Sequence, residues 1–242
     1  MSQDGDDEVI RKRSALAPAT VAVLAIVLLS ATLLLYYLAP GWHGPMQEQV
    51  APTSDTNKVS VTINGQKFRI PANYFEYDSE RKGGRRTEVF LFAHLPDLNG
   101  WTSWQADDYA DNLADSPAVF LTIHEDGNNL SDRERLARIY MGYVKDRRGT
   151  PGPHGLREYQ FRSDAGYRDE DLFVGSTENG PIILRCVRLS TKAPSPNCLS
   201  DTLIAKGVGL SYRFKRARLA DWRDIDTAAK ERIASFMRKK KK

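Results

Sequence analysis

Hydrophobic and polar positions divide the chain into an apolar amino-terminal run and a long region where short apolar patterns alternate with polar ones. Residues 15–39 carry no charge, and the polar segment before them, 1–14, contains Arg11, Lys12 and Arg13. A helix over this run is about 37 Å long, which exceeds a hydrocarbon core of about 30 Å. The pattern predicts a transmembrane helix over 15–39 that stays attached as a signal anchor.

The residues on either side of this apolar run also fit a cleaved signal peptide, and they predict how the chain is oriented in the membrane. A cleaved signal peptide also begins with basic residues, but its apolar core is shorter, about 7 to 15 residues. Lys and Arg precede the run and are absent between it and Lys58. The positive-inside rule therefore predicts a cytoplasmic amino terminus and a carboxy-terminal domain outside the cytoplasm. Tyr36, Tyr37 and Trp42 lie where an aromatic belt would meet the outer interface.

The region after the anchor begins with a predicted flexible stalk, 40–57, which is rich in Pro, Gly, Gln, Ser and Thr. The predicted domain covers 58–237. Alternating apolar residues on both sides of Asn64-Gly65 predict a β-hairpin. The same alternation predicts further strands at 87–95, 118–124, 156–162, 171–175, 181–189, 198–206 and 207–214.

Three segments show helical periodicity. A short helix is expected around 106–113, and Ser131 with Glu134 forms a capping box before a helix that continues to about 146. An amphipathic helix over 222–237 has Asp221 as its expected N-cap. This order predicts one extracytoplasmic α+β domain with a mainly antiparallel sheet and two to three helices. A division into two subdomains near Gly149 stays open.

Charge is concentrated at the end of the chain. The net charge is +4, and the tail 238–242 consists of basic residues only, so the predicted domain is close to neutral. A nucleic-acid-binding domain carries a basic face over its body. The charge distribution therefore argues against a nucleic-acid partner.

Cys186 and Cys198 are the only cysteines in the sequence, and both lie in the predicted extracytoplasmic domain. An oxidising compartment favours a disulfide between them, whereas two buried free thiols are the alternative. A disulfide requires Cα atoms within about 7 Å. The bridge would join adjacent strand ends across the loop that contains Pro194 and Pro196.

His94 and His124 end two predicted strands that share a pattern of aromatic or polar residues at alternate positions. If these strands pair in parallel and in register, the two imidazoles are neighbours. Glu125 or Asp126 could then add a carboxylate to a metal or proton-transfer site. Structural histidines are the alternative, because the spacing matches no known ligand motif.

Other chemical signals are weaker. Asp108, Asp111 and Asp115 would share one face of a helix, where their carboxylates could bind Ca²⁺. They lack the spacing of a calcium-binding loop, and the alternative is a helix face exposed to solvent. The sequence contains no Gly-x-Ser-x-Gly, phosphate loop, dinucleotide fingerprint or His-Glu-x-x-His. We therefore predict no cofactor and no metal site.

Two basic clusters are candidates for contact with anionic headgroups or envelope polysaccharide, and solubilising surface charge is the alternative for both. The first comprises Arg81, Lys82, Arg85 and Arg86, and the second comprises Arg213, Lys215, Arg216, Arg218 and Arg223. The tail is a third candidate for contact with the anionic membrane surface, through Lys239, Lys240, Lys241 and Lys242.

A group of residues near the carboxy terminus occurs behind an amino-terminal anchor: Cys186, Pro196-Asn197-Cys198, Tyr212-Arg213-Phe214, Leu219, Trp222-Arg223 and Ile225. This arrangement resembles single-pass, membrane-anchored proteins of proteobacteria that have no known activity. The likeness covers roughly the last 60 residues and the anchor. It implies a bacterial inner membrane and a periplasmic domain, and it implies no chemistry. A eukaryotic secretory lumen is the alternative compartment.

These features favour a non-enzymatic, membrane-tethered module that binds a partner protein or a cell-envelope polymer, because the predicted domain lacks catalytic spacing. The alternative is an extracytoplasmic hydrolase or metal-dependent enzyme that uses His94 and His124. The bilayer is the one partner that the sequence identifies, through the single predicted helix.

Overall fold

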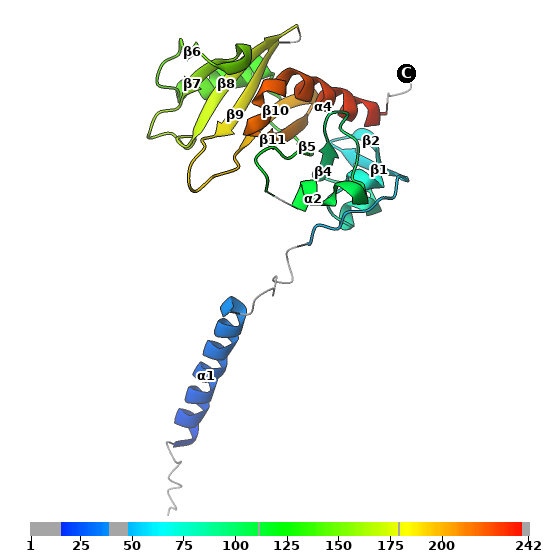
Figure 1. Ribbon diagram of the computed structural model, residues 1–242. Coiled ribbons are helices and arrows are strands. Elements are labelled where there is room, and N and C mark those ends of the chain that lie inside the picture. The colour runs from blue at the N-terminus through cyan, green and yellow to red at the C-terminus, as the bar shows by residue number, and fades with distance from the viewer. Residues whose placement is uncertain (1–15, 39–47, 111, 179, 239–242) are drawn as a thin grey trace, which may run out of the picture. The chain divides into compact units, whose positions relative to one another are not determined.

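Figure 1 shows the computed structural model of the chain, which describes residues 16–38, 48–110, 112–178 and 180–238. These residues form two compact units, one within Met1–Glu48 and the other within Gln49–Lys242.

The first unit contains the helix α1, Leu16–Leu38. Its length is about 35 Å, and it is apolar enough to cross a membrane. Side chains from Pro18 to Tyr37 are exposed, as expected of a helix whose apolar surface meets lipid. The Thr32 hydroxyl donates to the Leu28 carbonyl oxygen at 2.7 Å, so this polar group is satisfied inside the helix. The predicted apolar helix is confirmed.

The second unit begins earlier than predicted. The Ala51 N–H donates to the Glu76 carbonyl oxygen, and the Ala72 N–H donates to that of Asn57, both at 2.8 Å. Residues 49–57 are therefore hydrogen-bonded to the second compact unit, whereas the sequence predicts a domain start near Lys58. Backbone hydrogen bonds hold this segment although it has few apolar residues. Residues 40–47 of the predicted stalk lie outside the described residues, as does Ala39 at the end of the predicted transmembrane helix.

An eight-stranded sheet dominates the domain, in the order β4-β5-β11-β10-β9-β8-β7-β6, with every pair antiparallel. Its strands are β4 (Glu88–His94), β5 (Ala118–Glu125), β6 (Thr150–Pro151), β7 (Arg157–Gln160), β8 (Glu170–Thr177), β9 (Gly180–Val187), β10 (Asn197–Ala205) and β11 (Val208–Lys215). The predicted α+β class with a mainly antiparallel sheet is confirmed. Strands from both sides of Gly149 share this sheet, so the domain is not divided there.

A second, three-stranded sheet contains the predicted hairpin. β1 (Lys58–Ile63) pairs antiparallel with β2 (Gln66–Pro71), and β3 (Gly84–Arg85) pairs parallel with β1. Asn64 and Gly65 have φ angles of 43° and 78°. These positive values are those of a type I′ turn, which explains why Asn-Gly predicts the hairpin correctly.

The helix α4, Trp222–Phe236, covers one face of the large sheet, which we call the inner face (Figure 1). Its buried residues are Trp222, Ile225, Asp226, Ala229, Ile233 and Phe236. The buried carboxylate of Asp226 has two polar partners that offset its loss of hydration. The Tyr212 hydroxyl donates to it at 2.6 Å, and Lys230 pairs with it at 2.9 Å. The amphipathic helix is confirmed, but Asp221 makes no side-chain cap. The 3₁₀ turn Arg216–Asp221 leads directly into α4.

The opposite, outer face of the sheet is covered at β8 and β9 by a second apolar cluster that includes Tyr140, Phe161, Leu172 and Ile183. The helix α3, Asp132–Arg138, leads into this cluster and has the predicted capping box. It ends before the predicted residue 146, because the chain turns at Tyr140–Gly142 and Val144 then bridges to Phe161. Strand pairing of this segment replaces the last helical turns.

The remaining helix, α2 (Ala106–Ala110), is shorter than the predicted 106–113. The Tyr109 ring lies 5.0 Å from that of Phe92 and 6.4 Å from that of Phe120. α2 therefore covers the outer face at the β4 edge. Among the described residues, no helix covers the outer face between α2 and the Tyr140 cluster.

Candidate functional site

The two histidines that the sequence suggests as a pair are far apart. β4 and β5 are antiparallel, with His94 opposite Ala118 and Glu88 opposite His124. Ala118 and His124 lie at opposite ends of β5, about 20 Å apart at the rise of a strand. The parallel register required for a shared site is therefore wrong. The long connection between these strands carries α2 and returns the chain antiparallel to β4.

Each histidine has polar neighbours at both ring nitrogens. His94 Nδ1 lies 2.6 Å from the Leu95 carbonyl oxygen, and Nε2 lies 2.8 Å from Asp108 Oδ2. His124 Nδ1 lies 3.1 Å from the Glu125 carbonyl oxygen, and Nε2 lies 3.2 Å from the Ser211 hydroxyl. Each imidazole thus contacts groups around its own strand end, and the two imidazoles do not share a site.

One of the two predicted acidic partners, Asp126, is also engaged elsewhere. Asp126 pairs with Arg135 at 2.9 Å and accepts the N–H groups of Asn128 and Asn129. Burial acts to raise the pKa of Asp126, but those N–H groups and Arg135 outweigh burial and lower it. Within the described residues no group of three or more His, Cys, Asp or Glu side chains is arranged for a metal ion. Asp111 lies outside those residues.

The first basic cluster is divided between bound and exposed side chains. Arg81 pairs with Asp78 at 3.1 Å, and Arg86 donates to the Ser79 carbonyl oxygen at 2.5 Å. Lys82 and Arg85 are exposed. Two of the four cations therefore stabilise their own loop. Lys239, Lys240, Lys241 and Lys242 lie outside the described residues.

Most of the second basic cluster is structural. Arg216 pairs with Asp171 at 2.8 Å, Arg218 donates to the Asp115 carbonyl oxygen at 2.6 Å, and Lys215 donates to Asn112 Oδ1 at 2.5 Å. Arg223 lies over the Trp222 ring and donates to the Ser176 carbonyl oxygen at 3.2 Å. Arg213 differs, because no hydrogen bond or ion pair to it occurs among the described residues, and it is exposed.

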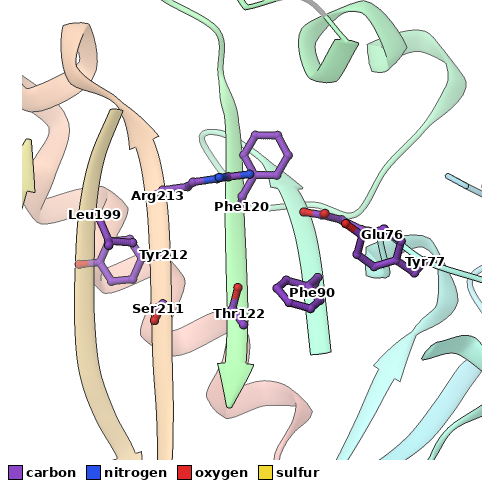
Figure 2. A pocket seen from close by; sticks show the side chains of 9 residues that line it. All are labelled: Glu76, Tyr77, Phe90, Phe120, Thr122, Leu199, Ser211, Tyr212 and Arg213. Carbon is purple, nitrogen blue, oxygen red and sulfur yellow. The ribbon is translucent and has the colours of Figure 1, made fainter. Parts of the chain in front are cut away.

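Arg213 lies at a pocket of about 350 Å³ on the uncovered part of the outer face, which we call the outer-face groove (Figure 2). Cross-strand pairing brings its floor together, since Phe90 lies opposite Thr122, Thr122 opposite Ser211, and Phe120 opposite Arg213. Glu76 and Tyr77 form one wall. The lining residues are Glu76, Tyr77, Phe90, Phe120, Thr122, Leu199, Ser211, Tyr212 and Arg213.

Two opposite charges face this groove without contacting each other. Glu76 comes from the segment before β4, and Figure 2 shows its carboxylate pointing toward Phe120. Arg213 reaches from β11 to Phe120, where its guanidinium carbon lies 4.5 Å from the ring centre. Burial raises the pKa of Glu76, and the positive charge of Arg213 opposes that rise. The groove thus combines aromatic surface with two charges available to a ligand.

The disulfide lies at a junction within the sheet. Cys186 and Cys198 are bonded, with Cα atoms 4.0 Å apart, and they join the end of β9 to the start of β10 as the sequence predicts. In the described chain β9 and β10 pair only at Cys198 with Cys186 and at Leu199 with Arg185. α3 lies beside both strands beyond that point, where Asp132 accepts the Thr202 hydroxyl at 2.9 Å.

Sequence reasoning missed Glu76 as a site residue. It follows Phe75 in a segment with no motif, and nothing in the local pattern shows that its side chain is buried. Arg213 and Phe120 attract attention for other reasons, as a member of a basic cluster and as a strand residue. Their register, which places them side by side, becomes visible only in the folded sheet.

Neither a protein-family model nor a curated protein sequence matches this chain. Two solved structures are similar to it. Smlt3025, an immunity protein of the Stenotrophomonas maltophilia type IV secretion system, is 18% identical with a TM-score of 0.54, over 76% of this chain and 94% of that one. The Neisseria meningitidis iron-regulated outer membrane lipoprotein FrpD is 13% identical with a TM-score of 0.46, over 78% and 96%.

The likeness to Smlt3025 shows a shared fold.

Proposed function

We propose that this protein is a non-enzymatic module, tethered to the bacterial inner membrane, that binds a protein partner in the periplasm through the outer-face groove. The groove is the observation that carries the proposal. It offers partly buried aromatic rings and an exposed arginine without an ion pair, and interfaces between proteins are enriched in these side chains.

Three further observations support the compartment. α1 is long and apolar enough to anchor the chain. Lys and Arg lie before the apolar run and are absent immediately after it, which supports a cytoplasmic amino terminus by the positive-inside rule. The bond between Cys186 and Cys198 suits an oxidising compartment.

The binding role has separate support. The structural neighbour Smlt3025 is described as an immunity protein of a type IV secretion system, which is compatible with a protein that acts by binding.

The orientation predicts the behaviour of a reporter fused after Lys242. An alkaline phosphatase fusion is expected to be active, because that enzyme requires an oxidising compartment, and a fluorescent reporter that folds only in the cytoplasm is expected to be dark. Protease added to spheroplasts should remove the domain. Deleting 15–39 is the control and should reverse both reporter results. A bright cytoplasmic reporter on the intact chain would contradict the orientation.

The groove predicts the site of partner capture. A photo-crosslinking phenylalanine analogue at Phe120 in the full chain, irradiated in intact cells, is expected to yield one or a few discrete adducts with another protein. The matched control places the same residue at Trp104, whose side chain is 96% exposed and lies outside the groove. Equal adduct patterns at both positions, or none at Phe120, would contradict the groove as the binding site.

A further inference from the structure

We infer that the outer-face groove recognises a basic side chain of the partner protein, an arginine or a lysine, which Glu76 holds against the rings of Phe90 and Phe120. This inference rests on the proposed function and names the chemistry that the partner presents.

Glu76 supplies the first argument. Its residue is 8% exposed, and among the described residues no hydrogen bond or ion pair reaches its carboxylate. Burial removes hydration from this carboxylate, and the charge of Arg213 offsets the loss only in part, since the pKa of Glu76 stays raised. A cation that enters the groove would provide the missing partner. Because the carboxylate points toward Phe120 (Figure 2), that cation would lie beside the floor of the groove.

The aromatic rings supply the second argument. Phe90 and Phe120 line the groove, and the Tyr77 ring meets that of Phe90 edge-on at 5.7 Å. Aromatic faces attract guanidinium and ammonium groups. Arg213 already demonstrates this, because its guanidinium lies over Phe120 at 4.5 Å. The same ring is therefore shaped and exposed for a cation.

The charges around the groove favour a cation over an anion. Glu76 is the one carboxylate among the described residues that line it, and a second carboxylate, Asp201, is bonded to the Ser211 hydroxyl of its floor. The positive charge of Arg185 also acts on Asp201, but Arg185 forms an ion pair with Glu170 at 2.8 Å, so its charge is largely balanced. Arg213 is the opposing charge, and its long exposed side chain can leave Phe120 when a ligand arrives. Arg213 thus acts as an internal competitor for the ring.

The test measures binding of a blocked amino acid to the full chain in nanodiscs. The probe is N-acetyl-arginine methylamide, and the matched control probe is N-acetyl-citrulline methylamide, which has nearly the same shape and no charge. We expect the arginine probe to shift the amide resonances of residues on β4, β5 and β11 with a Kd of about 1 mM, and the citrulline probe to bind at least about tenfold more weakly.

Two variants that each neutralise one of the charged groove residues, Glu76 or Arg213, provide a second measurement. Glu76→Gln should weaken the arginine probe about tenfold, whereas Arg213→Gln should tighten it severalfold because the competitor is removed. Glu76→Gln removes a buried charge, so it should fold, and unchanged thermal unfolding verifies this. Binding to the unmodified chain should also strengthen as the pH rises through the pKa of Glu76, which burial raises above its ordinary value, because the carboxyl then loses its proton.

Two results would overturn the inference: equal binding of both probes, or full arginine binding by Glu76→Gln. The Phe120 crosslink separates this failure from failure of the proposed function. Protein adducts without preference for the arginine probe would leave a protein-binding groove that takes no basic side chain. Arginine binding without adducts would establish the cation pocket and reject the protein-binding role.

Discussion

Replacing Trp222 with alanine is expected to lower the free energy of unfolding by about 3–5 kcal/mol, the usual cost of removing a buried tryptophan. The residue is 1% exposed at the start of α4. Its ring lies directly on Gly175 of β8, where an added Cβ would come 2.5 Å from the ring. Its indole N–H donates to the His154 carbonyl oxygen at 3.1 Å. Alanine removes this packing and leaves the His154 carbonyl oxygen without this donor.

Urea unfolding followed by circular dichroism measures this loss. Trp104→Ala is the matched control, because its side chain is 96% exposed, and it should change stability by no more than about 0.5 kcal/mol. Gly175→Ala tests the same contact from the sheet side and should also destabilise, since the new methyl group collides with the ring. A Trp222→Ala variant as stable as the Trp104→Ala variant would show that α4 does not anchor the sheet through this residue.

The elements that sequence reasoning predicts well are those with purely local causes. α1 follows from an uncharged run, the β1–β2 turn from Asn64-Gly65, and the start of α3 from the capping box of Ser131 and Glu134. α4 follows from apolar residues at intervals of three and four. In each case neighbouring residues determine the backbone, so distant contacts are not needed.

The elements that sequence reasoning predicts wrongly depend on distant contacts. α3 ends earlier than predicted because Val144 bridges to Phe161. The backbone hydrogen bond from Ala51 to Glu76, which ties residues before Lys58 to the second unit, is also a contact that local sequence does not indicate. Asp221 has the right residue type for an N-cap, but a 3₁₀ turn precedes α4 and no cap forms. The residues next to each element in the sequence do not indicate these distant contacts.

The candidate site was less predictable than the fold. The predicted pairing of His94 with His124 requires parallel strands. β4 and β5 are antiparallel, so the two histidines lie far apart. The residues that do meet, Glu76, Phe120 and Arg213, come from a loop and two strands far apart in sequence. Their charge and aromatic character are visible in the sequence, but their proximity follows from the order β4-β5-β11.

Loss of the Cys186–Cys198 bond is expected to lower the free energy of unfolding by about 3 kcal/mol, given the short loop that it closes. The position of the bond adds a local effect. In the described chain β9 and β10 pair only beside this bond, so it secures the junction between the two halves of the large sheet. Without it, we expect faster hydrogen exchange at Arg185 and Leu199 than elsewhere in the sheet.

Urea unfolding and hydrogen exchange of Cys186→Ser, Cys198→Ser and the double variant measure both effects. The double variant should resemble either single variant, because one bond is lost in all three, and exchange in the β4–β5 pair is the internal control. Leu199 lies beside Cys198 and lines the outer-face groove, so a loosened junction should also weaken the arginine probe. Unchanged stability together with unchanged exchange at Leu199 would show that α3 and the surrounding core hold the two halves of the sheet without the disulfide.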